Sequence, residues 1–303
     1  MRVAVILSTY NGEKYLRQQL DSILGQEGVD PELFIRDDGS RDATVSVLRE
    51  YEESCKNVHV NAGENIGFRQ SFIREMLAHE GFDFYAFSDQ DDFWEKDKLK
   101  AACDVITQKC RTDVPAVYYS NLNISDEELN ICRRTQLEKR KHTLPSVIMR
   151  RSIAGCTMVL NRTMWERIKE KEITDQALRR GHDSFIISLC YALGGCVLCD
   201  ERAFIRYRQH RDNTSGGING PAERIRKEWN ALTRKKGQEA EMANAILEGW
   251  NAQIDDRNAA ILRTVASSKK MRSRFKLFFS KEYCTGDLKL TALGKAKALL
   301  GLL

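Results

Sequence analysis

Short apolar runs alternate with helical patterns along the first part of the chain. Apolar stretches predict β-strands at residues 2–8, 32–36 and 57–60, and a fourth strand beginning at Phe84. After each stretch, apolar residues recur at three- and four-residue spacing, which predicts a helix following every strand. Asn11 stands where the N-cap of the first helix is expected. This alternation predicts an α/β fold with a Rossmann-like, mainly parallel sheet flanked by helices.

The pattern changes in the last third of the chain. Strand signals end near residue 220, and apolar residues such as Met242, Ile246 and Trp250 then recur at helical spacing. We therefore predict an α/β domain over residues 1–220 and a helical, basic amphipathic region over residues 221–303. The Gly-, Asn- and Ser-rich stretch just before this boundary, residues 212–220, is predicted to be a lid or a linker.

Polar residues gather where the predicted strands end. Loops rich in Asp, Asn and Gly follow the strands at residues 9–12, 37–40, 63–67 and 89–92. Because the loops of a parallel sheet emerge at one edge, these four loops should form a single crevice. In the last loop, Asp89, Asp91 and Asp92 follow a buried aromatic run, and a hard divalent cation would neutralise them. A solvated turn explains one such loop, but four together predict a nucleotide and metal site.

Two later stretches carry further candidate chemistry. Arg206, Arg208 and His210 alternate along an extended stretch and would place two guanidinium groups and an imidazole on one face, which suits a diphosphate. A surface strand with solvated charges is the alternative. Asp183 begins a predicted helix after His182, and its spacing alone favours a helix cap. A carboxylate there could also take a proton from a bound hydroxyl if the helix start faces the crevice.

Charge changes this picture mainly at the C-terminal end. The formal net charge of +5 is too small to indicate nucleic acid, and we expect none as a partner. Residues 267–303, however, are rich in Lys, Arg, Phe and Leu, with only Glu282 and Asp287 as acids. This end could lie in the headgroup region of an anionic membrane or pack on the protein's own core. With no signal-peptide pattern and no membrane-spanning apolar run, we expect a cytoplasmic protein, at the cytoplasmic face of the membrane if this end binds lipid.

Five short motifs, taken in order, carry a family resemblance. They are Ser8-Thr9-Tyr10-Asn11-Gly12, Asp37-Asp38-Gly39-Ser40-Arg41-Asp42, Asn65-Ile66-Gly67-Phe68, Ser88-Asp89-Gln90-Asp91-Asp92 and His182-Asp183. The ordered set resembles the inverting nucleotide-sugar glycosyltransferases of family 2, which have the GT-A fold. With Tyr207-Arg208-Gln209-His210 and Asn213-Thr214-Ser215-Gly216 downstream, it is most similar to the bacterial rhamnosyltransferase branch that builds surface polysaccharides.

The resemblance, together with the loop pattern, assigns roles to individual residues. The expected donor-binding residues are Thr9, Tyr10, Asn11, Asp38, Asn65, Gly67, Asp89, Arg206 and Arg208. Asp89 and Asp91 match the family's DxD motif, which implies that Asp89 meets the sugar or ribose and that Asp91 coordinates Mg²⁺ or Mn²⁺. The resemblance makes His210 a further metal or diphosphate contact. Asp183 matches the catalytic base, although the residue before it is His182 where the family usually has an acid.

The implied function is metal-dependent, inverting transfer of a sugar, with L-rhamnose as one candidate. The donor would be a UDP- or dTDP-sugar, and the acceptor a hydroxyl of a glycan or of a lipid-linked acceptor in surface polysaccharide biosynthesis. Asp183 would deprotonate this hydroxyl, while the cation and Arg206 or Arg208 would stabilise the departing diphosphate. Two alternatives use the same residues: a metal-dependent nucleotidyl- or phosphotransferase, and an inactive glycan- or nucleotide-binding module. The sequence predicts no particular oligomeric state.

Overall fold

The computed structural model describes residues 1–150, 153–210 and 236–303, which belong to two compact units. Unit 1 comprises residues 1–137, 153–170 and 198–210; unit 2 comprises residues 138–152, 171–197 and 211–303. Unit 2 thus includes residues 138–152 and 171–197, which were predicted to belong to the first domain. The predicted boundary at residue 220 and the predicted lid or linker at 212–220 lie outside the described residues.

The first four strands of unit 1 form the parallel part of its sheet. They are β1 (Arg2–Thr9), β2 (Asp30–Asp37), β3 (Val58–Ala62) and β4 (Phe84–Ser88), in the order β3-β2-β1-β4. Thr9 lies opposite Asp37, which in turn lies opposite Ala62. Strands β1, β2 and β3 therefore end in register, while β4 ends opposite Leu7, two residues before the end of β1. The loops that follow the strands leave from one edge, as the sequence pattern predicted.

The rest of the sheet contains β5 (Phe93–Trp94), β6 (Ala116–Ser125), β7 (Ile131–Arg134), β8 (Val159–Asn161) and β9 (Cys196–Arg208). Here the pairs β4–β8, β6–β8, β6–β7 and β5–β9 are antiparallel. The sheet continues from β4 in the order β8-β6-β9-β5, and β7 pairs with β6 beside this path. Because Phe93 of β5 lies opposite Arg206 of β9, the loop at residues 89–92 comes close to the end of β9.

Helices α1 (Glu13–Leu24), α2 (Thr44–Ser54), α3 (Phe68–Ala78), α4 (Lys98–Lys109) and α6 (Arg162–Lys169) accompany this sheet. On α1, the predicted apolar face of Leu16, Leu20 and Ile23 has no exposed surface, which confirms the periodicity argument. Burying each of these side chains stabilises the fold by about 1.5–3 kcal/mol. The predicted α/β architecture is therefore confirmed.

The start of α1 differs from the prediction. Gly12, rather than Asn11, is the N-cap, and no side chain caps the helix. Asn11 instead has a positive φ of 49°, and its Oδ1 accepts a hydrogen bond from the Arg41 N–H at 2.9 Å. The prediction of Asn11 as the N-cap is wrong because the side chain bridges to the neighbouring loop, a contact that local spacing does not encode.

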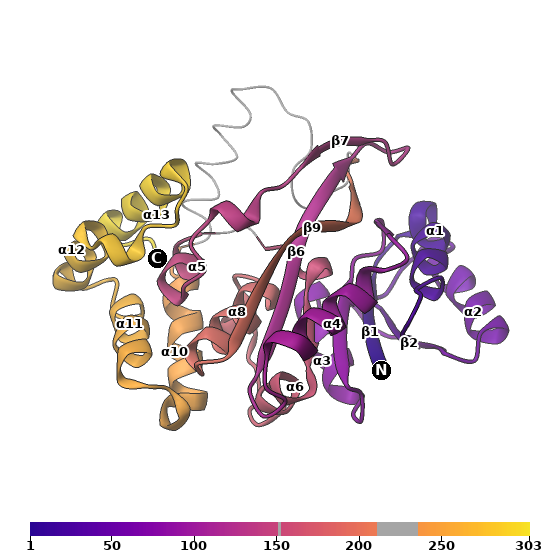
Figure 1. Cartoon of the computed structure of the whole chain (residues 1–303), viewed down its shortest axis with the longest axis horizontal. Helices are drawn as coiled ribbons and strands as arrows, with labels where there is room; N and C mark the ends of the chain where they lie inside the picture. The colour runs from indigo at the N-terminus through magenta and orange to yellow at the C-terminus, as the bar shows by residue number, and fades with distance from the viewer. Residues whose placement is uncertain (151–152, 211–235) are drawn as a thin grey trace. The chain divides into compact units, whose positions relative to one another are not determined.

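Unit 2 is helical in its described part. Its helices are α5 (Leu144–Met149), α7 (Asp175–Leu178), α8 (His182–Ala192), α10 (Gln238–Trp250), α11 (Asp256–Ala266), α12 (Met271–Phe279) and α13 (Leu288–Leu300). Helix α10 packs on α7, α8 and α11, while α12 packs on α13. Met242, Ile246 and Trp250 of α10 are buried. No strand occurs between residues 236 and 303, so the predicted helical character of this region is confirmed there (orange to yellow in Figure 1).

Candidate active site

The ends of β1 and β2 are joined by side-chain hydrogen bonds. Thr9 Oγ1 donates to Asp37 Oδ1 at 2.9 Å in a buried contact. Asp37 Oδ2 accepts from the N–H groups of Gly39 and Ser40 at 3.1 and 2.9 Å. Gly39 has a φ of 85°, which a side chain would disfavour. Asp37 and Thr9 thus fix the shape of the second loop.

Asp38 connects this loop to the third one. The Asp38 carboxylate, which is 2% exposed, accepts the N–H of Ile66 through Oδ1 and that of Gly67 through Oδ2, both at 2.8 Å. The Gly67 N–H is also 3.2 Å from Asn65 Oδ1. The Asp38 N–H donates to the Thr9 carbonyl at 2.9 Å. The predicted convergence of the first three loops is therefore confirmed by direct contacts.

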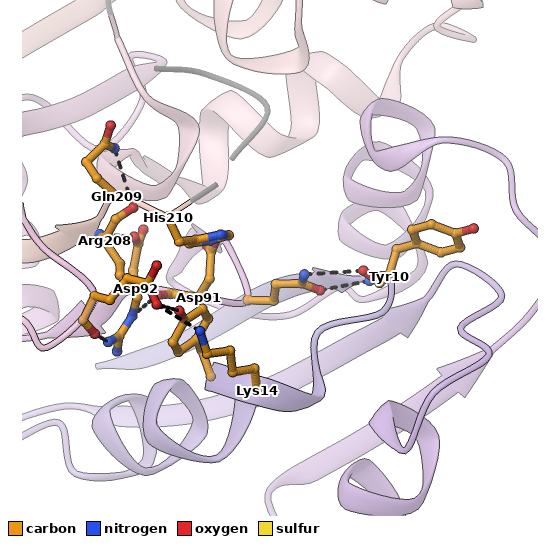
Figure 2. Close-up of polar contacts among 10 residues, drawn as sticks. Tyr10, Lys14, Asp91, Asp92, Arg208, Gln209 and His210 are labelled. Atoms are coloured by element: carbon orange, nitrogen blue, oxygen red, sulfur yellow. Dashed lines mark hydrogen bonds and ion pairs between the residues drawn. The ribbon is translucent and has the colours of Figure 1, made fainter. Parts of the chain in front are cut away.

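Gln90 brings in the fourth loop. The Tyr10 N–H donates to Gln90 Oε1 at 2.8 Å, and Gln90 Nε2 donates back to the Tyr10 carbonyl at 3.3 Å (Figure 2). A Cβ on Gly12 would lie 2.4 Å from Gln90 Oε1, so glycine leaves room for this amide. The ring of Tyr10 is 47% exposed. No role was predicted for Gln90, although a lone amide within an acidic motif, able both to donate and to accept, could have indicated one.

Asp91 and His210 meet although they are far apart in the sequence. His210 Nε2 lies 2.7 Å from Asp91 Oδ2. The His210 ring also lies beside Tyr15, with 5.1 Å between ring centroids. The two residues predicted to contact a metal are therefore neighbours, and Figure 2 shows them together with Asp92 and Arg208.

Arg208 is held by the protein itself. Its side chain is nearly buried, and it donates to the Asp91 carbonyl at 2.8 Å, to Gln18 Oε1 at 2.5 Å and to the Glu127 carbonyl. The guanidinium carbon also lies 4.3 Å from the centre of the Tyr15 ring. Arg208 therefore fixes the main chain of the acidic loop.

Arg206 has a different environment. Its Nε donates to Glu95 Oε1 at 2.8 Å, and its guanidinium lies over the ring of Phe93. Arg206 and Arg208, which were predicted to act together on one face, therefore contact different partners. The pairing of β5 with β9 brings Phe93 and Glu95 to Arg206. A direct contact of Arg206 or Arg208 with the donor stays a prediction.

The three carboxylates of the acidic loop differ in environment. Asp92 has no exposed surface, and its Oδ1 accepts the N–H of Arg208 at 3.1 Å. Burial, together with the charges of Asp91 and Asp89, raises the pKa of Asp92 well above its usual range. Donor atoms of Asp89, Asp92 and Cys156 lie within 4.8 Å of one another. Crowded carboxylates of this kind are stabilised by a cation, so Asp89 and Asp92 suit a divalent ion with oxygen ligands. The predicted ligands Asp91 and His210 are not part of this cluster, which has Cys156 as its third member.

A buried lysine lies behind this loop. Lys98 Nζ is 3.4 Å from the centre of the Trp94 ring and forms no hydrogen bond to any described residue. Burial lowers the pKa of Lys98 to about 7, although the neighbouring Cys156, Cys103 and Asp92 act to raise it. The sequence pattern gave no sign of this group, because Lys98 opens α4 like an ordinary surface residue.

Side chains of α1 and of the turn between β6 and β7 form a hydrogen-bonded cluster that was not predicted from the sequence. Glu127 Oε2 accepts from Lys14 Nζ at 2.8 Å and from the Tyr15 hydroxyl at 3.0 Å. These hydrogen bonds lower the pKa of Glu127, and the nearby His210 contributes. Glu127 lies in a polar turn with no motif, so only the fold connects it with Tyr15 and His210.

In unit 2, Asp183 is the second residue of α8. Gly181 is the N-cap, with a φ of 129°, so the interpretation of Asp183 as the helix cap is wrong. Asp183 is half-buried, and its Oδ1 accepts the N–H of Ser184 at 2.6 Å. A Cβ on Gly181 would lie 2.3 Å from that oxygen. Glycine is therefore required at 181 both by the backbone and by the carboxylate.

Arg180 fixes the segment that leads into α8. It is 6% exposed and donates to the carbonyls of Val147, Ile148 and Arg150 at the end of α5. It also lies 3.7 Å from Glu239 of α10, which pairs with Lys297 of α13 at 2.8 Å. Burial acts to raise the pKa of Glu239, but the two cations lower it overall. This network, which no motif indicated, joins α5, α10 and α13 to the start of α8.

Residues 4–166, more than half of the chain, match the family model described as Glycosyl transferase family 2. The chain therefore belongs to this family and is a glycosyltransferase, which confirms the resemblance seen in its motifs. Among its relatives, the dTDP-rhamnosyl transferase RfbG of Shigella flexneri is 28% identical over 222 residues, which cover 69% of this chain and 73% of that protein. TuaG of Bacillus subtilis, named as a glycosyltransferase of teichuronic acid biosynthesis, is 26% identical over 63% of this chain and 77% of its own length.

Solved structures agree on the fold. S. aureus TarS in complex with UDP-GlcNAc superposes with a TM-score of 0.59 at 18% identity, covering 100% of this chain and 82% of that one. The mannosyltransferase PcManGT from Pyrobaculum calidifontis, in complex with GDP-Man and Mn²⁺, gives 0.53 at 18% identity, covering 99% and 86%. The predicted GT-A fold is thereby confirmed. In the described part of the chain, no helix has the length and apolar character needed to cross a bilayer.

Proposed function

We propose that this glycosyltransferase moves a sugar, with inversion, from a nucleoside diphosphate donor to a hydroxyl of a glycan or lipid-linked acceptor in surface polysaccharide biosynthesis. The observation that carries the proposal is the contact of Asp91 with His210, in a loop that Gln90 joins to the other strand ends. The names of RfbG and TuaG support polysaccharide assembly, and that of RfbG makes dTDP-L-rhamnose the first donor to test.

The nucleoside half of the donor would occupy the first three loops. The side chain of Tyr10 is exposed, and the base of the donor could stack on its ring. Gln90 fixes the main chain of Tyr10 and so holds this ring in place. Thr9 and Asp38 shape these loops through their hydrogen bonds to Asp37 and to Ile66 and Gly67. Asn11, Asn65 and Gly67 complete the nucleoside half of the proposed donor-binding set, and Arg206 and Arg208 remain its proposed diphosphate contacts.

A divalent cation, Mg²⁺ or Mn²⁺, would be held by Asp91 and His210, with Asp89 turned to the sugar or ribose. When bound, it supplies positive charge that offsets the charge of the departing diphosphate. Oxygen donors suit both ions, and the imidazole of His210 favours Mn²⁺. The protein's part is to bring the ligands together: Arg208 fixes the main chain of Asp91, and His210 Nε2 lies 2.7 Å from Asp91 Oδ2.

Asp183 is the proposed catalytic base. Its carboxylate is half-buried in the first turn of α8, and Gly181 and Arg180 determine how the chain enters that turn. In the proposed step, Asp183 takes the proton of the acceptor hydroxyl as the oxygen attacks the anomeric carbon from the face opposite the nucleotide. One base suffices, because the leaving diphosphate needs charge stabilisation more than a proton.

The test is a panel of nucleotide sugars, beginning with dTDP-L-rhamnose, incubated with the full chain and Mg²⁺, Mn²⁺ or a chelator. Release of the nucleoside diphosphate with transfer or hydrolysis of labelled sugar supports the proposal, whereas labelled phosphate in the product contradicts it. We expect Asp183→Asn to abolish transfer while keeping donor binding, and Asp91→Ala to lose metal-dependent binding. Glu53→Gln, an exposed carboxylate on α2, is the matched control. Full turnover by either site variant would refute that residue's role.

A further inference from the structure

We infer that helices α12 and α13 form a surface that docks onto an anionic lipid bilayer. The terminal helix face is defined by exposed apolar side chains on these two helices: Met271, Phe275, Phe279, Leu288, Leu293, Leu299 and Leu300. This inference goes beyond the proposed reaction, because it concerns where the enzyme works, and it requires neither donor nor acceptor.

On α12, the apolar stripe points to solvent. Met271, Phe275 and Phe279 are spaced four residues apart and are 58%, 46% and 69% exposed. Leu277, on the other side of the helix, is fully buried and provides the packing contact. Residues spaced four apart share one face of a helix, so this stripe is continuous. The helix thus uses a different side chain to pack within unit 2.

On α13, small residues make the packing contacts. Gly294 and Ala298 are buried, and a Cβ on Gly294 would lie 3.0 Å from the Met149 carbonyl of α5. The leucines lie outside this contact: Leu288 is 91% exposed and Leu300 is 61% exposed. The side chains of the terminal helix face therefore do not pack on the protein's own core, although Leu277 and Leu303 of the same C-terminal stretch do.

Cations accompany these apolar side chains. The exposed basic residues of the C-terminal segment, residues 267–303, are Lys269, Lys270, Arg272, Lys276, Lys281 and Lys289. Its two acids are engaged: Glu282 pairs with Arg257 at 3.5 Å, and Asp287 caps α13 by accepting the N–H of Leu290. Lipid phosphates would pair with the cations while the aromatic and leucine side chains enter the acyl boundary. A second copy of the chain would instead bring like charges together, which opposes self-association.

Flotation of the full chain with phosphatidylcholine vesicles, with and without phosphatidylglycerol, tests this surface. We expect binding only to the anionic vesicles and a marked decrease as salt rises. Arg272→Glu with Lys276→Glu should weaken binding at least about thirtyfold. Lys56→Glu with Lys109→Glu, exposed cations of unit 1, changes the net charge equally and should leave binding unchanged.

The apolar contribution is tested separately. Phe275→Ser with Phe279→Ser should reduce binding about tenfold or more, whereas Ile131→Ser, at a residue that is 51% exposed on β7, should not. Vesicle binding that is unchanged by both α12 double variants would overturn the inference. So would a dimer, detected by light scattering, that the Phe variant disperses while vesicles remain unbound. Loss of sugar transfer with intact vesicle binding would count against the proposed function alone.

Discussion

Replacing Arg180 with Met removes one cation from a buried network while keeping most of the volume of the side chain. Arg180 donates to three main-chain carbonyls and lies 3.7 Å from Glu239, which is itself 4% exposed. The variant leaves those carbonyls without their donor and leaves Glu239 with Lys297 alone. Removing one partner of a buried ion pair typically costs about 3–5 kcal/mol.

The neighbouring residue provides the control. Arg179 pairs with Glu241 at 2.6 Å, but these side chains are 39% and 32% exposed. Solvent screens such a pair, so Arg179→Met should cost only about 0–1 kcal/mol. The two variants remove the same group from adjacent positions, and the difference between them measures the buried ion pair together with the three carbonyl hydrogen bonds of Arg180.

Guanidinium denaturation of both variants, followed by circular dichroism, measures the free energy of unfolding. Glu239→Gln on the Arg180→Met background should recover part of the loss, because it removes the charge left behind, and the cycle should give a coupling of at least about 1 kcal/mol. Equal destabilisation by Arg179→Met and Arg180→Met, or the absence of coupling to Glu239, would refute the reasoning.

Three other predictions concern the two units. Gly181 has a φ of 129°, and a Cβ there would lie 2.3 Å from Asp183 Oδ1, so Gly181→Ala should lower kcat strongly. Gly194→Ala, whose Cβ would meet nothing within 4 Å, should lower kcat far less. Equal initial rates of the two variants would contradict this prediction. Gln90→Ala should raise the KM for the donor about tenfold by freeing the Tyr10 main chain, with kcat less affected. Burial lowers the pKa of Lys98 from 10.5 to about 7, so between these pH values the unfolded state binds more protons than the folded state. The contribution of Lys98 to the free energy of unfolding therefore increases by about 1.4 kcal/mol for each unit by which the pH rises. Denaturation midpoints from pH 7 to about 10 should show this slope in the wild type, and its persistence in Lys98→Met would contradict the assignment.

Local pattern was enough to place the elements and the loops. Leu16, Leu20 and Ile23 predict a helix because a buried face repeats every three to four residues, whatever the rest of the fold. Parallel strands then carry their loops to one edge, so the meeting of the loops that contain Thr9 and Asp38 follows from topology. The metal role of Asp91 and the base role of Asp183 came from the resemblance, and they stay proposals.

Long-range contacts account for what the sequence did not indicate. The contacts of Arg208 with Gln18, Glu127 and the Asp91 main chain join three separate elements, and no motif indicated them. The contact of Arg208 with a diphosphate stays a prediction. Asn11 was expected to cap α1 but bridges to Arg41 instead. Such contacts depend on how strands and turns pair, and spacing within one segment carries no information about them.

The acidic motif is short for the two strands that it connects. In that order β8, β6 and β9 lie between β4 and β5, yet residues 89–92 alone connect Ser88 to Phe93. A flat sheet would separate β4 from β5 by about 19 Å, whereas five Cα steps span at most about 18 Å. The sheet must therefore curl for so short a segment to join β4 to β5, and the segment bends at Gln90 and Asp91 instead of running straight between the strands. The four residues that include Asp89 and Asp91 thus join two strands that are distant in the sheet order and that the curl of the sheet brings near each other.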